Sequence, residues 1–170
     1  ADRAHALNQA VRQLDELVGL PEDDPLVWRS RLARATCQRL LGDFASAETS
    51  LAQIAKHAPA DVALRGRTEA LRLALDRGQV GQAVGLLQTP SELAHVAQPD
   101  WDFARLEASL AAWSEAVDRG DATAAEQWQA RATEMVRFIE SRWGAYWTRR
   151  AESLLASRFR HAADSGDRDT

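Results

Sequence analysis

The chain has 170 residues, of which 45% are hydrophobic, and it carries a formal net charge of −4 at pH 7. This composition is typical of a folded protein and argues against a disordered chain. The acidic balance argues against a general nucleic-acid binder, which would carry a basic surface over its whole domain.

Apolar residues recur at helical spacing along nearly the whole chain, and capping residues, prolines and glycines separate the periodic segments. The chain lacks the runs of β-branched residues that favour strands, so we expect an all-α fold without a sheet. Asp24, Asp61 and Asp121 are the expected N-caps of three helices. The predicted helices cover about 4–18, 25–41, 44–56, 61–75, 80–87, 90–96, 100–117, 122–139 and 145–155.

A short pattern repeats four times, at intervals of about 40 residues. It consists of Gly or Ser, then an apolar residue two positions on, then Ala three positions further. The copies are Gly42-Phe44-Ala47, Gly78-Val80-Ala83, Gly120-Ala122-Ala125 and, more faintly, Ser157-Phe159-Ala162. A glycine that ends a helix can adopt the left-handed conformation, and the alanine lets two helices approach closely. The pattern therefore predicts helical hairpins, which must stack on one another to bury their apolar faces.

The first copy resembles the tetratricopeptide repeat (TPR) family, whose repeats have about 34 residues. The residues that carry the resemblance are Ala35, Gly42, Phe44, Ala47, Leu51, Ile54 and Pro59. The second copy keeps Gly78, Val80, Ala83 and Leu87, and the third keeps Gly120 and Ala125. The resemblance implies a right-handed array, or solenoid, of about seven to nine antiparallel helices. Another family of helical-hairpin repeats is the alternative for the later copies.

We expect one TPR-like repeat domain over 1–162, followed by a polar tail over 163–170 that frays. Because the chain opens on Ala1 and its fourth copy is faint, we expect it to be part of a longer protein. No stretch of about 18 apolar residues occurs, so we expect no membrane span. The compartment stays open, with the cytoplasm as the default.

TPR proteins bind peptides along the concave surface that the first helix of each hairpin lines. By register, the resemblance places on this surface Arg29, Leu32, Thr36, Arg39 and Leu40, then Arg65, Thr68, Arg72, Leu75 and Asp76, then Glu107, Leu110, Ser114, Val117 and Asp118. Four of them, Arg29, Arg39, Arg65 and Arg72, are arginines, which pair bidentately with carboxylates. We therefore predict a non-catalytic scaffold that binds a protein or peptide partner, with an acidic segment as the favoured ligand. An ordinary solvated face is the alternative, because the lysines and asparagines of the family's carboxylate clamp are absent.

A second cluster of arginines and aromatic residues lies near the C-terminus. Its members are Arg137, Arg142, Trp143, Tyr146, Trp147, Arg149 and Arg150. Such interleaving can stack on single-stranded RNA, but Trp143, Trp147 and Leu154 also recur at helical spacing, which favours packing in the core. The same core interpretation covers Trp28, Trp101, Trp113 and Trp128. Single-stranded RNA binding and self-association into a homodimer through exposed end repeats remain the two alternative functions.

We find no motif that predicts an enzyme, a cofactor or a metal site. The histidines His5, His57, His95 and His161 are scattered without ligand spacing. No phosphate-binding loop and no nucleophile elbow occur. Cys37 is the only cysteine, so no intrachain disulfide can form, and we expect it to pack as a small hydrophobic residue.

Overall fold

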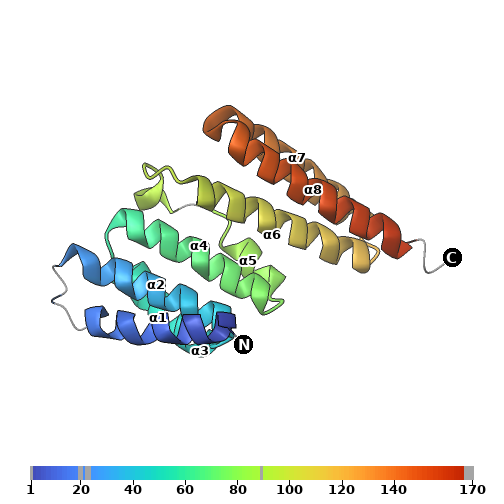
Figure 1. The fold of residues 1–170 in the computed structure, drawn as a ribbon. Helices are drawn as coiled ribbons and strands as arrows, with labels where there is room; N and C mark the ends of the chain where they lie inside the picture. Colours follow the sequence, from blue (N-terminus) through green and yellow to red (C-terminus); the bar gives the residue numbers. More distant parts are fainter. Residues whose placement is uncertain (1, 19–20, 22–23, 89, 167–170) are drawn as a thin grey trace. The chain divides into compact units, whose positions relative to one another are not determined.

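The computed structural model describes residues 2–18, 21, 24–88 and 90–166. This part of the chain contains eight α-helices, one short 3₁₀ helix and no strand, so the all-α prediction is confirmed for it (Figure 1). The helices are α1 (Asp2–Val18), α2 (Pro25–Leu41), α3 (Phe44–His57), α4 (Ala60–Asp76), α5 (Val80–Gly85), the 3₁₀ helix η1 (Ser91–Leu93), α6 (Pro99–Asp118), α7 (Ala122–Trp143) and α8 (Ala145–Gly166). None of the described helices is long and apolar enough to cross a membrane.

Internal contacts divide the chain into two compact units. The first unit comprises Ala1–Arg77 and Thr89–Val96, and therefore holds α1 to α4 and η1. The second comprises Gly78–Gln88 and Ala97–Thr170, and holds α5 to α8. Each unit has its own hydrophobic core, and each is described separately below.

In the first unit, consecutive helices pack against each other from α1 to α4, and α4 also contacts α2 and η1. The buried core consists of Val27, Trp28, Ala35, Ala47, Leu51, Ile54, Val62 and Leu73. Trp28 is buried at 6% exposure, as the helical periodicity predicted. Burying these side chains stabilises the unit by roughly 2 kcal/mol for each large one. Helices α2 and α3 thus form a helical hairpin that α4 covers.

A tight turn at Gly42 joins α2 to α3. Gly42 has a φ of +82°, a left-handed conformation that costs a residue with a side chain about 1 kcal/mol or more. Its N–H donates to the Arg39 carbonyl at 3.0 Å. The next N–H, that of Asp43, donates to the Gln38 carbonyl at 2.9 Å. The Asp43 carboxylate then accepts the Ser46 N–H at 3.3 Å and caps α3, so one dipeptide ends one helix and begins the next.

Helices α3 and α4 approach closely where Gly66 faces Ile54. A Cβ atom at Gly66 would lie 2.6 Å from Cγ2 of Ile54, well inside van der Waals contact. Both residues are buried, and Ile54 is completely so. The missing side chain of Gly66 therefore sets the distance between these helices, a role that the repeat pattern did not reveal.

The second unit repeats the arrangement of the hairpin α2–α3 and its covering helix α4. Helices α6 and α7 form a hairpin, and α8 packs on both. The short helix α5 contacts α6. The core consists of Phe103, Leu106, Leu110, Ala132, Met135, Val136, Ile139 and Ala151, with Trp143, Trp147, Leu154, Leu155 and Phe159 packed against it.

The turn between α6 and α7 has the same hydrogen bonds as the turn between α2 and α3. Gly120 has a φ of +68°, and its N–H donates to the Val117 carbonyl at 2.9 Å. The Asp121 N–H donates to the Ala116 carbonyl at 2.9 Å. The Asp121 carboxylate accepts the Ala124 N–H at 3.0 Å, so the predicted cap is confirmed. The first and third copies of the sequence pattern therefore encode one turn geometry in two separate units.

The fourth copy of the pattern does not mark a turn, contrary to expectation. Ser157 lies inside α8, which continues without a break to Gly166. Its hydroxyl donates to the Leu154 carbonyl of the preceding turn at 2.8 Å, and this bond is compatible with a continuous helix. Because α8 reaches Gly166, part of the segment 163–170 that we expected to fray is helical, and 167–170 lie outside the described residues.

Three smaller expectations about helix bounds were also wrong. Asp61 does not cap α4, because the helix begins at Ala60 and its N-cap is Pro59. Asp61 instead lies in the first turn of α4, where its negative charge interacts favourably with the positive end of the helix dipole. Helix α5 ends at Gly85 rather than at Leu87, and the segment after Pro90 forms only η1.

Candidate interaction site

Two of the four predicted groove arginines are bound to carboxylates within the first unit. Arg39 of α2 donates from Nε to Oε2 of Glu69 on α4 at 3.0 Å, and from Nη1 to Asp76 at 2.5 Å. Arg72 donates from Nη1 to the other oxygen of Glu69 at 3.2 Å. The side chains of Arg39 and Glu69 are each 11% exposed. Arg39 therefore links α2 to α4, whereas the pair of Arg72 with Glu69 lies within α4.

The other two arginines, Arg29 of α2 and Arg65 of α4, line a hollow of about 420 Å³ between these helices. Both residues are exposed, and within the described residues we find no ion pair to either one. The remaining residues that line this hollow are Leu32, Ala33, Thr36, Cys37, Asp61 and Val62. We refer to these eight residues as the α2–α4 groove. The groove therefore contains two of the four predicted arginines, and the other two are not among its lining residues.

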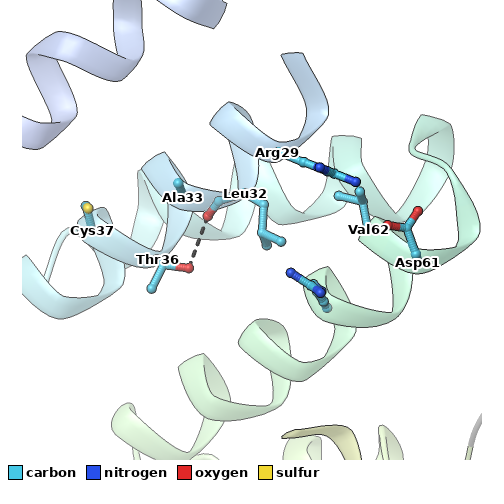
Figure 2. Close-up of a pocket in the computed structure, with 8 residues that line it drawn as sticks. Arg29, Leu32, Ala33, Thr36, Cys37, Asp61 and Val62 are labelled. Atoms are coloured by element: carbon cyan, nitrogen blue, oxygen red, sulfur yellow. Dashed lines mark hydrogen bonds between the residues drawn. The ribbon is translucent and has the colours of Figure 1, made fainter. Parts of the chain in front are cut away.

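Figure 2 shows how the two helices contribute to the groove. Arg29 extends from α2 toward Val62 and Asp61, which lie at the start of α4. Thr36 lies one turn after Leu32, and its hydroxyl donates to the Leu32 carbonyl at 3.0 Å. This internal bond occupies the hydroxyl proton of Thr36, so the residue offers a ligand mainly an acceptor and a methyl group.

The chemistry of the groove combines positive charge with an apolar wall. Two guanidinium groups and the single carboxylate of Asp61 give it a formal charge of +1, and Leu32, Ala33 and Val62 supply apolar surface. Guanidinium groups bind carboxylates through paired hydrogen bonds, and apolar walls bind aliphatic side chains. The groove therefore fits a peptide that carries an acidic residue beside an aliphatic one.

Cys37 lines the groove rather than the core. It is partly buried, and burial raises the pKa of its thiol because the charged thiolate is poorly solvated there. At neutral pH the group is therefore a neutral thiol, which is a weak nucleophile. The prediction of a small hydrophobic residue describes its chemistry, while its position makes it part of the lining of the groove.

Sequence reasoning missed four groove residues: Ala33, Cys37, Asp61 and Val62. The first two lie four and eight positions after Arg29, and so continue one stripe of α2. The other two lie one turn before Arg65 on α4. Extending the helical stripe by two turns after Arg29 and by one turn before Arg65 would have found all four. The partners of Arg39 are thirty and more positions away, and no local pattern indicates them.

The predicted positions on α6 lie in the second unit. Leu110 is completely buried in the core of that unit, and Glu107 and Ser114 are partly buried. Val117 and Asp118, at the end of the helix, are exposed. The five positions that the resemblance predicted on α6 therefore include buried, partly buried and exposed side chains.

Two members of the arginine and aromatic cluster near residue 143 pack against the second core, and the other five are exposed. Trp143 donates from Nε1 to Oδ2 of the buried Asp102 at 2.9 Å. Trp147 lies against Phe103, with ring centroids 6.0 Å apart. Trp143 and Trp147 pack against the core, as their helical spacing predicted.

Arginines of this cluster cover the faces of the same rings. The guanidinium of Arg150 lies 4.6 Å from the Phe103 ring centroid and 5.2 Å from that of Trp147. That of Arg142 lies 5.2 Å from the centroid of Trp143. Cation–π contacts of this kind stabilise the fold and occupy the ring faces that a nucleic-acid base would use.

Comparison of the chain with family models, with curated proteins and with solved structures gave no match.

Proposed function

We propose that this chain is a non-catalytic protein-interaction module whose α2–α4 groove binds an acidic peptide segment of a partner. The observation that carries the proposal is the position of Arg29 and Arg65 on two helices around one hollow with an apolar wall. The neutral thiol of Cys37 in the same hollow gives little support to covalent catalysis there.

The resemblance to TPR repeats supports the same function. The turns at Gly42 and Gly120 each join two helices into a hairpin, and in each unit a third helix packs on that hairpin. We further propose that these hairpins belong to a right-handed TPR-like array, in which first helices such as α2 and α4 line the binding surface. A peptide on that surface would meet the α2–α4 groove directly.

Binding of a fluorescently labelled peptide that alternates Glu and Leu tests this proposal. Exchanging Arg29 and Arg65 together for Glu is expected to weaken binding by about tenfold or more, because two charge-assisted pairs are lost. Higher salt should weaken binding to the unmodified chain, since exposed charges are screened.

The matched control is the pair Arg12→Glu and Lys56→Glu. These residues are exposed in the same unit and outside the groove, so the control makes the same change in net charge. Equal losses in both variants would show that only the net charge matters, and would contradict a binding site at the groove. A Gln and Leu peptide that binds as tightly as the acidic peptide would contradict the proposed ligand.

A further inference from the structure

A second hollow, of about 650 Å³, lies between α6 and α7 in the second unit. Arg105 of α6 lines one side, and residues of α7 line the other. The α7 residues that matter here are Gln127, Arg131, Glu134, Met135 and Phe138. None of them belongs to the surface that the TPR resemblance indicated, so this α6–α7 hollow is independent of the groove proposed above.

The guanidinium of Arg105 makes only weak hydrogen bonds inside its own unit. Its Nη1 lies 3.4 Å from Oδ1 of Asp102, which is a long distance for a charge-assisted hydrogen bond. The other oxygen of Asp102 accepts the Trp143 indole at 2.9 Å, so this carboxylate is shared. The Nε of Arg105 is buried and has no acceptor among the described residues. A buried donor without a partner costs free energy that an incoming acceptor would recover.

Apolar surface lies beside this guanidinium. Met135 and Phe138 both line the hollow; Met135 is buried, and Phe138 is 36% exposed. An aliphatic side chain placed here would bury its own surface and that of Phe138.

Charge limits what the hollow can accept. Arg105 and Arg131 are positive and Glu134 is negative, so the lining has a formal charge of +1. The guanidinium of Arg131 lies over the Trp128 ring, 5.4 Å from its centroid. Glu134 opposes a second negative charge, and it therefore disfavours phosphate groups and clusters of acidic residues. A single carboxylate is therefore the acidic group that matches the formal charge of the hollow.

We propose that the α6–α7 hollow binds a partner peptide through a single carboxylate side chain that Arg105 holds, with an adjacent aliphatic side chain on Met135 and Phe138. Because Nε is buried in the unliganded chain, the guanidinium first turns away from Asp102. The carboxylate then accepts from Nε and from one terminal nitrogen of Arg105, which is the side-on pairing that guanidinium geometry favours. On binding, the guanidinium of Arg105 gives up its long contact with Asp102 and forms this pair with the peptide carboxylate.

The Nε–H signal of Arg105 in a proton–nitrogen correlation spectrum of the full chain reports this pairing directly. The probe is the dipeptide acetyl-Leu-Glu-amide, and Arg105→Lys identifies the signal by its loss. Titration is expected to shift this signal. Acetyl-Leu-Gln-amide and acetyl-Gly-Glu-amide should each bind about tenfold more weakly, because one lacks the charge and the other the aliphatic side chain.

Variants of the chain and one small acid test whether Arg105 holds the peptide carboxylate. Arg105→Lys is expected to weaken binding of the Leu-Glu peptide by about tenfold, because a point charge cannot form the side-on pair. Arg137→Lys is the control, since Arg137 is exposed on α7 outside this hollow. If Arg105→Lys does not fold, Phe138→Ala replaces it, with weaker binding expected. Equal affinity for the Gln peptide, an unshifted Arg105 signal, or hexanoate binding as tightly as the peptide would each overturn the proposal.

Discussion

Arg39 on α2 and Glu69 on α4 form an ion pair at 3.0 Å in which each side chain is only 11% exposed. Arg72 and Asp76 complete the cluster, so that both oxygens of Glu69 and two nitrogens of Arg39 are used. The pair joins residues that are thirty positions apart and fixes α4 against α2. Two arginines that sequence reasoning assigned to a partner therefore form ion pairs within the fold, and Arg29 and Arg65 are the two that line the α2–α4 groove.

Exchanging Glu69 for Gln should lower the free energy of unfolding by about 2–3 kcal/mol, because the largely buried Arg39 keeps only its pair with Asp76 and Arg72 loses its pair with Glu69. Urea unfolding followed by circular dichroism measures this. Asp15→Asn is the comparison, since Asp15 pairs with Arg34 at 2.7 Å but is 48% exposed, and its loss should cost at most about 0.5 kcal/mol. Equal effects of the two changes would show that burial does not govern the Glu69 cluster.

Replacing Gly66 with Ala should destabilise the first unit by about 1–3 kcal/mol, because the new Cβ would lie 2.6 Å from Cγ2 of Ile54. Gly81 of α5 is the control, since a Cβ there meets nothing within 4 Å. The change Gly81→Ala should stabilise the chain by up to about 1 kcal/mol through helix propensity. Adding Ile54→Ala to the Gly66 variant should cost less than the sum of the single losses. Strict additivity would show that the two residues do not clash.

Asp121→Ala should cost about 1 kcal/mol of stability, since its carboxylate caps α7 through the Ala124 N–H at 3.0 Å. Asp121→Asn should cost almost nothing, because asparagine caps helices about as well. Thermal unfolding of the two variants separates the hydrogen bond from the charge. A loss of the same size with Asn would assign the effect to the helix dipole instead.

Trp143→Phe should destabilise the second unit by about 1–3 kcal/mol beyond the effect of lost volume, because the buried Asp102 loses a hydrogen-bond donor. Trp128→Phe provides the volume control, since its indole forms no hydrogen bond among the described residues and Trp128 is partly buried on α7. Urea unfolding of both variants gives the difference. In the unmodified chain the Trp143 indole N–H should also exchange with solvent more slowly than that of Trp128.

The thiol of Cys37 should react more slowly than free N-acetylcysteine at neutral pH, because its raised pKa leaves a smaller fraction as thiolate. The rate of alkylation by iodoacetamide, measured against pH, should rise at a higher pH than it does for the free amino acid. Unfolding in urea should restore ordinary reactivity. If an acidic peptide binds the α2–α4 groove as proposed, it should slow the reaction further, and an unchanged rate with peptide bound would contradict contact between Cys37 and the ligand.

The sequence by itself determined which segments are helices and where most of them begin and end. Signals such as Asp24 before Pro25, or Gly42 followed by Asp43, act within one helical turn, so the residues that carry them are neighbours in the chain. The prediction of a turn at Ser157 was wrong, because a serine hydroxyl can form a local hydrogen bond inside a helix without ending that helix.

Only the tertiary structure decided which arginines are available to a partner. Arg29 and Arg39 lie on one helix and looked equivalent by register, yet Arg39 meets Glu69 and Asp76 while Arg29 lines a hollow. The close approach at Gly66 and the weakly satisfied guanidinium of Arg105 likewise depend on the helix packed opposite. Helix ends follow from local hydrogen bonds, whereas the pairing of charges follows from the register between helices, which packing of the whole unit sets.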